Sequence, residues 1–117
     1  RAWAALGRPV AELLTRRLRD GDVLGRTGPW TFAVLLHGMQ PAQARRIAER
    51  LLRAVREGTF TWDGDPVPLT LSAGVAGYQQ GHPEDAAQLL AEAEARLRDA
   101  QAAGADSVRG DDPRPWS

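Results

Sequence analysis

Few side chains in this chain have the type and spacing that metal or nucleophile chemistry requires. The two histidines, His37 and His82, are far apart and show no metal-ligand spacing, so surface or capping roles are expected. Asp63 and Asp65 lie in a Gly/Pro turn, and a cation loop would need more oxygen ligands. The chain has no Cys, which excludes thiolate zinc sites and cysteine nucleophiles. We therefore expect neither a metal site nor a cofactor.

The charge balance limits the class of partner. Lys+Arg and Asp+Glu number 15 each, so no net field draws the chain toward nucleic acid or anionic membrane. The arginines between Arg45 and Arg56 lack interleaved aromatic residues, which favours a solvated helix face over RNA binding. No apolar run approaches the roughly 20 residues of a membrane span, and no signal peptide is visible. We expect a cytoplasmic domain with no membrane contact and no nucleic-acid partner.

The first part of the chain has the pattern of a helix followed by a hairpin. Apolar residues at helical spacing predict a helix from Val10 to about residues 19–21, with Pro9 in its first turn or at a kink. Two strand-like runs follow at residues 23–24 and 32–36. Between them, Gly28 and Pro29 have the properties of a two-residue hairpin turn, because glycine supplies the positive φ.

The rest of the chain repeats this order. Its predicted elements are a helix at residues 41–58, strands at 59–62 and 69–76 joined by a turn at 63–66, a helix at 83–103 ending at Gly104, and a short strand at Val108. Helices that alternate with hairpins indicate an α+β fold with a mainly antiparallel sheet and flanking helices. We expect one domain over residues 1–108 and a tail or linker over residues 109–117.

Four segments share the order and spacing of motifs in a known family. Residues 19–36 are RDGDVLGRTGPWTFAVLL, which resembles the R-x-x-D-x-x-x-R-x-G-G-[DE]-E-F-A-V-L-L motif of GGDEF domains, the diguanylate cyclases. Residues 44–51, 71–76 and 89–108 resemble that family's A-x-x-I-A-E-R-L helix, its S-I-G-V-A strand and its closing helix. The resemblance covers about residues 8–108. It implies a nucleotidyl-cyclase-like fold in a bacterial signalling protein.

The departures from the family pattern fall on catalytic positions. The family joins two GTP molecules into cyclic di-GMP with Mg²⁺, and hard carboxylate oxygens hold the metal. In the segment Gly28-Pro29-Trp30-Thr31-Phe32, Trp30 and Thr31 replace these carboxylates. Pro29 replaces the second glycine and has no N–H for a phosphate. We expect Trp30 to fill the former nucleotide pocket or, alternatively, to form an exposed contact for a partner.

Other positions depart together with the signature. The resemblance places the family's phosphate-contacting Lys at Gln101 and its Gly-Arg pair at Gly104 and Ala105. The chain also begins after the family's first strand, which carries a metal-binding Asp and lies centrally in the sheet. We therefore expect a fold truncated at the N-terminus, with strand edges that upstream sequence, rearranged strands or a partner chain would cover. We do not expect this degenerate domain to be an enzyme.

One ligand site of the family is retained in the sequence. Its product-binding R-x-x-D motif matches Arg19 and Asp22, and the arginine that completes it matches Arg50. Guanidinium groups bind phosphate or a guanine edge bidentately, and a carboxylate accepts guanine N–H groups. The resemblance thus implies a cyclic di-GMP receptor.

The competing interpretation gives these three residues local roles. Arg19 and Asp22 would serve a helix end and a turn, and Arg50 would belong to a solvated face. The domain would then be a protein interaction or dimerisation module without a nucleotide ligand. Its partner would be a second copy, giving a homodimer, or a flanking signalling domain.

Overall fold

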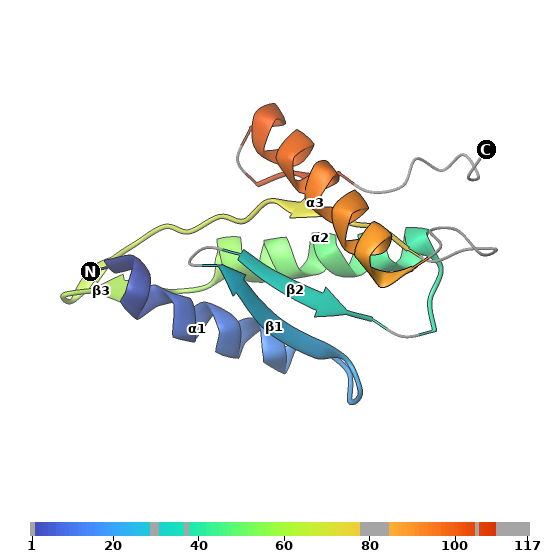
Figure 1. The fold of residues 1–117 in the computed structure, drawn as a ribbon. Helices are drawn as coiled ribbons and strands as arrows, with labels where there is room; N and C mark the ends of the chain where they lie inside the picture. Colours follow the sequence, from blue (N-terminus) through green and yellow to red (C-terminus); the bar gives the residue numbers. More distant parts are fainter. Residues whose placement is uncertain (1, 29–30, 37, 78–84, 105, 110–117) are drawn as a thin grey trace.

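The computed structural model describes residues 2–28, 31–36, 38–77, 85–104 and 106–109 (Figure 1). The elements along the chain are α1 (Ala2–Arg16), β1 (Val23–Gly28), β2 (Thr31–Leu35), α2 (Pro41–Glu57), β3 (Thr61–Trp62), β4 (Asp65–Pro66), β5 (Ala73–Gly74), α3 (Ala86–Ala103) and β6 (Val108–Arg109). The strands form three two-stranded ladders, of which β1–β2 and β3–β4 are antiparallel and β5–β6 is parallel. The predicted α+β class with mainly antiparallel pairing is confirmed.

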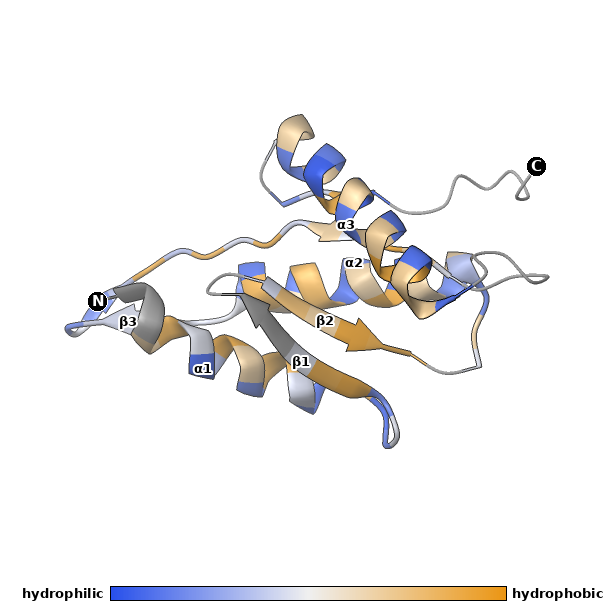
Figure 2. Ribbon diagram, viewed as in Figure 1, coloured by the Kyte–Doolittle hydropathy of each residue, from blue (hydrophilic) through white to orange (hydrophobic). Residues whose placement is uncertain are grey.

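The main hydrophobic core lies where α1 packs on α2. Leu6, Val10 and Leu14 are buried at helical spacing on α1, and they meet Leu51 and Val55 of α2. The side chain of Val55 is completely enclosed, at 0% exposure. Figure 2 shows hydrophobic and hydrophilic residues alternating along both helices, as expected for helices that bury one stripe. This core holds the end of α1 against the middle of α2.

The extent of α1 differs from the prediction. The helix begins at Ala2, not at Val10, and Pro9 lies inside it. Pro9 cannot donate a hydrogen bond to the carbonyl of Ala5, and an interior proline costs about 3 kcal/mol. Burial of a leucine such as Leu6, which is 2% exposed, returns about 1.5–3 kcal/mol. Tertiary packing on both sides of the proline therefore explains why the helix continues through it.

The first predicted hairpin is confirmed, although its turn is placed differently. β1 and β2 pair from Val23 opposite Leu35 to Gly28 opposite Thr31, with an irregularity in register between Arg26 and Gly28. Gly28 is therefore a strand residue and not the first residue of a turn. Pro29 and Trp30 lie outside the described residues, and so do the predictions made for them.

The second predicted hairpin is much shorter than expected. β3 and β4 contain two residues each, and Asp63 and Gly64 between them have φ values of 53° and 81°. Positive φ at both connecting residues is typical of a type I′ turn. The prediction that residues 69–76 form a strand along residues 59–62 is wrong. Within that segment the structure has only β5, which pairs in parallel with β6.

The third helix lies across the β5–β6 ladder (Figure 1). It begins after Asp85, whose side chain accepts a 2.8 Å hydrogen bond from the backbone N–H of Gln88. It ends before Gly104, which has a φ of 126° and is the predicted terminal glycine. β6 extends to Arg109, one residue into the segment that we expected to be a tail. None of the helices in the described part of the chain is long and apolar enough to cross a membrane.

Gly74 permits the close approach of α3 to β5. A Cβ atom at this position would lie 2.1 Å from the backbone oxygen of Ala93 and 2.2 Å from the backbone nitrogen of Leu97. Both are backbone atoms of the helix, so no side-chain rotation relieves the overlap. The absence of a side chain at Gly74 thus sets the distance between helix and ladder.

Replacing Gly74 by Ala is expected to lower the free energy of unfolding by about 1–3 kcal/mol, because α3 must move to admit the methyl group. Urea unfolding followed by circular dichroism measures this. Gly25→Ala in β1 is the matched control, since a Cβ there has no atom within 4 Å. Equal stability of the Gly74→Ala variant and the parent chain would contradict the packing described above.

Candidate functional site

The loop after α1 brings together Arg19 and Asp22, two of the three residues that the resemblance assigns to a ligand site. The Asp22 carboxylate accepts hydrogen bonds from the Arg19 backbone N–H at 2.9 Å, from Nε at 3.2 Å and from Nη2 at 3.0 Å. In return, the backbone N–H of Asp22 donates to the carbonyl of Arg19 at 3.1 Å. Gly21 between them has a φ of 93°, a conformation that glycine adopts without steric cost. These contacts close a tight loop directly after the helix.

The two side chains of this pair differ in exposure. The Asp22 side chain is only 3% exposed, although the residue as a whole is half-buried because its backbone faces solvent, while the Arg19 side chain is 53% exposed. The hydrogen bond to Asp22 raises the pKa of Arg19 above its ordinary value; desolvation opposes the shift and Coulomb attraction adds to it. Because the Arg19 side chain is half exposed, solvent screens the attraction within this ion pair, and we expect its contribution to stability to be small. Its main effect is to fix the orientation of the solvent-accessible guanidinium group of Arg19.

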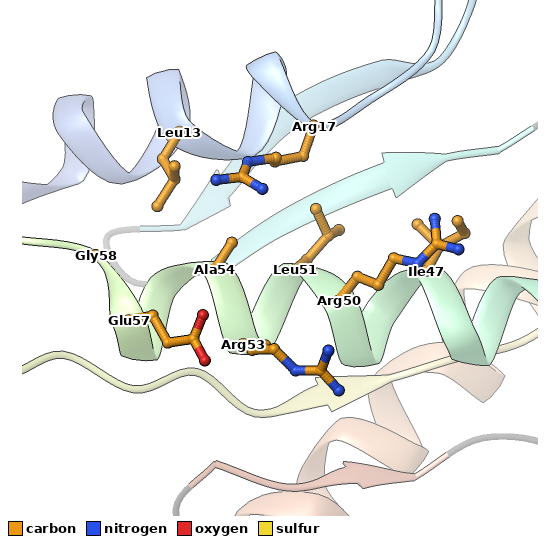
Figure 3. Close-up of a pocket in the computed structure, with 9 residues that line it drawn as sticks. All are labelled: Leu13, Arg17, Ile47, Arg50, Leu51, Arg53, Ala54, Glu57 and Gly58. Carbon is orange, nitrogen blue, oxygen red and sulfur yellow. The ribbon is translucent and has the colours of Figure 1, made fainter.

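Arg50 lies on α2 and lines a different feature, a pocket of about 570 Å³ between α1 and α2 (Figure 3). The lining residues are Leu13, Arg17, Ile47, Arg50, Leu51, Arg53, Ala54, Glu57 and Gly58. Neither Arg19 nor Asp22 is among them. The structure therefore joins Arg19 to Asp22, and it places Arg50 with Arg17, which is two residues before Arg19 in the chain.

The segment at residues 28–32, which aligns with the family signature, is only partly described. Gly28 ends β1, and Thr31 and Phe32 begin β2, both half-buried. Phe32 packs against the main core, which gives this aromatic residue a structural role. Gln101 is exposed near the end of α3, whereas Ala105 lies outside the described residues. Within the described ranges, no group of three or more His, Cys, Asp or Glu side chains is arranged to hold a metal ion.

Sequence reasoning missed two arginines that share the pocket with Arg50. The sequence pattern places Arg53 on the solvated face of α2 and assigns no role to Arg17. The spacing of Arg50 and Arg53, three residues apart on one helix, was a signal that both occupy the same face. Arg17 carried no such signal, because its place beside α2 depends on how the two helices pack.

A comparison with protein-family models decides the family. Residues 8–107 match the model described as "Diguanylate cyclase, GGDEF domain". The chain belongs to the GGDEF family. Among curated relatives of this GGDEF domain, diguanylate cyclase DgcP of Pseudomonas aeruginosa is 32% identical over 99 residues, and probable diguanylate cyclase DgcE of Escherichia coli is 34% identical over 93 residues. These alignments cover 85% and 80% of the chain, but the chain spans only 14% and 8% of the two relatives.

Solved structures agree with this assignment. The GGDEF domain of FimX from Pseudomonas aeruginosa superposes with a TM-score of 0.79 at 30% identity, over 90% of this chain and 64% of that one. Diguanylate cyclase SiaD of the same species, solved in complex with its activator SiaC, gives 0.75 at 28% identity, over 85% and 37% of the two chains. The family and the fold that the motifs implied are thereby confirmed.

The geometry of the loop generates a prediction for Asp22. Asp22→Ala leaves the Arg19 backbone N–H without its acceptor, so the free energy of unfolding is expected to fall by about 1 kcal/mol. Asp22→Asn retains an acceptor oxygen and is expected to lose less. Arg19→Ala, which keeps the backbone hydrogen bond, serves as the control in the same urea titration. If Arg19→Ala proved as destabilising as Asp22→Ala, the carboxylate would act through the ion pair and not through the loop.

Proposed function

We propose that this GGDEF domain is a catalytically inactive signalling domain that binds cyclic di-GMP through Arg19, Asp22 and Arg50. The observation that carries the proposal is the Arg19 fork, held from one side by a buried carboxylate and half exposed to solvent. A guanidinium fixed in this way loses little rotational freedom when it binds a phosphate or the O6/N7 edge of guanine. Its orientation is set before any ligand arrives.

The contacts and burial of these residues support a different part for each of them. Asp22 directs its carboxylate to three N–H groups of Arg19 and is almost fully buried, so we assign it to positioning Arg19. Arg19 and Arg50 are exposed cations and would contact the ligand directly. Arg50 would reach it from α2, across the same interhelical space that the end of α1 borders.

Loss of catalysis is supported by the residues of the signature and of α3. Trp30 and Thr31 offer no carboxylate to Mg²⁺, and Gln101 offers a neutral amide where the family has a cation. The curated relatives are named diguanylate cyclases, and we propose that this chain lacks the activity for which they are named.

The purified chain is expected to form no cyclic di-GMP from GTP and Mg²⁺, because the metal lacks its hard oxygen ligands. Chromatographic quantification of the product tests this, with an active diguanylate cyclase assayed in parallel as the positive control. Product formation above the enzyme-free blank would refute the proposed loss of catalysis. It would leave ligand binding to be judged separately.

Binding is tested by calorimetric titration of the chain with cyclic di-GMP. The Arg19→Ala, Asp22→Ala double variant is expected to bind at least about tenfold more weakly, since a hydrogen bond to a charged group contributes about 1.5–3 kcal/mol. Arg46→Ala, which removes an exposed arginine of α2 that does not line the pocket, is the matched control. Unchanged affinity in the double variant would reject the site.

A second candidate function is a protein interaction module, which one surface feature favours. Val23 and Leu35 lie opposite each other at the open end of the β1–β2 ladder, and they are 55% and 51% exposed. Two apolar side chains exposed next to each other at a strand end offer a small contact area to a partner chain. A silent titration, combined with self-association that is lost on Val23→Thr and Leu35→Thr substitution, would favour this function over ligand binding.

A further inference from the structure

The pocket between α1 and α2 combines an apolar floor with a charged rim. Leu13, Leu51 and Ala54 form buried walls, and Arg17 and Arg50 border the opening from the two helices (Figure 3). Its volume of about 570 Å³ is within the range of roughly 300–1,000 Å³ found for small-molecule sites. A charge that enters such a pocket interacts more strongly than it would on open surface, because the walls lower the local dielectric.

The arginines of this rim differ from three arginines on the same helices that form ion pairs. Arg8 pairs with Glu12 at 3.5 Å and Arg45 pairs with Glu49 at 3.8 Å. Arg56 pairs with Asp106 at 2.5 Å. Each of these three arginines therefore forms an ion pair with a carboxylate.

No such partner is found for the cations of the pocket. Among the residues that the structure describes, no carboxylate lies within the 4.0 Å ion-pair distance of Arg17, Arg50 or Arg53. Glu57 lines the same pocket, one turn after Arg53, without forming an ion pair to it. Three guanidinium groups thus share one opening with a single carboxylate, an arrangement that a bound anion would stabilise.

We propose that Arg17 is a further binding residue, which contacts a phosphate group of the cyclic dinucleotide in the pocket that Arg17 and Arg50 both line. The inference rests on the proposed function, and it extends that site from the Arg19–Asp22 loop to the interhelical pocket. Arg17 is suited to this role because it follows the last turn of α1 and faces α2 (Figure 3), only two residues before Arg19. Arg53 lies at the edge of the same opening and contributes to its positive potential.

The alternative is that these arginines are only a solvated surface whose general charge attracts anions. A general field would respond equally to the loss of any nearby arginine, whereas a binding residue would not. Arg16 provides the matched control. It is exposed, ends α1 next to Arg17, carries the same charge and borders a separate hollow formed by Arg8, Ala11, Glu12 and Thr15.

The test is a set of calorimetric titrations with cyclic di-GMP at 150 mM salt, using the parent chain and the variants Arg17→Ala, Arg16→Ala and Arg19→Ala. Arg17→Ala is expected to weaken binding about tenfold or more, as for loss of a charge-assisted hydrogen bond. Arg16→Ala is expected to change affinity less than about twofold, because screening attenuates exposed charges. Arg17→Lys, which keeps the charge but not the planar fork, is expected to fall between the parent and Arg17→Ala.

The outcomes separate this inference from the proposed function. If Arg17→Ala binds like the parent chain while Arg19→Ala is impaired, the role of Arg17 is refuted and the receptor function stands. Equal losses in Arg16→Ala and Arg17→Ala would also refute it, in favour of a general field. A parent chain that does not bind cyclic di-GMP would overturn both. Circular dichroism of each variant confirms that a loss of binding is not a loss of folding.

Discussion

The contact between α1 and α2 is the constraint on which the rest of this domain depends. It encloses Val55 completely and buries the apolar stripe of α1 on both sides of Pro9. The same contact fixes where α1 ends, and so it sets where the Arg19–Asp22 loop leaves the helix. It also creates the pocket that Arg50 borders. The charged residues proposed to bind a ligand are therefore positioned by a hydrophobic interface that none of them belongs to.

Much of the fold could be predicted because local patterns agreed with the tertiary structure. The helix from Pro41 shows one clear apolar stripe, and the structure places its end at the predicted position before Gly58. The partners of short strands could not be predicted in this way. Residues 69–76 alternate like a hairpin strand, yet β5 pairs with β6 at the far end of α3. Strand pairing depends on which strand edges the packed helices bring together. The alternation of apolar and polar residues in the sequence does not determine this.

The candidate site, like the fold, could be predicted from the sequence only in its local features. Arg19 and Asp22 are three residues apart within one loop, so the sequence already placed these two residues near each other. Whether an arginine has a carboxylate partner is a property of the folded chain. Arg56 forms an ion pair with Asp106, 50 residues away in the sequence. Arg17 and Arg50 instead line the same pocket. Arginines that look equivalent in the sequence therefore have different electrostatic surroundings.

The division of the strands into three ladders has a consequence for the local unfolding of this domain. In the described residues no strand belongs to two ladders, so backbone hydrogen bonds do not connect the β1–β2 pair to the β5–β6 pair. Cooperativity between them passes through side chains, because residues of α2 contribute to both hydrophobic clusters and Leu71 packs against both. Local fluctuations could release one ladder while the other stays closed. The β1–β2 and β5–β6 ladders would then have different local unfolding equilibria, coupled through α2 and Leu71.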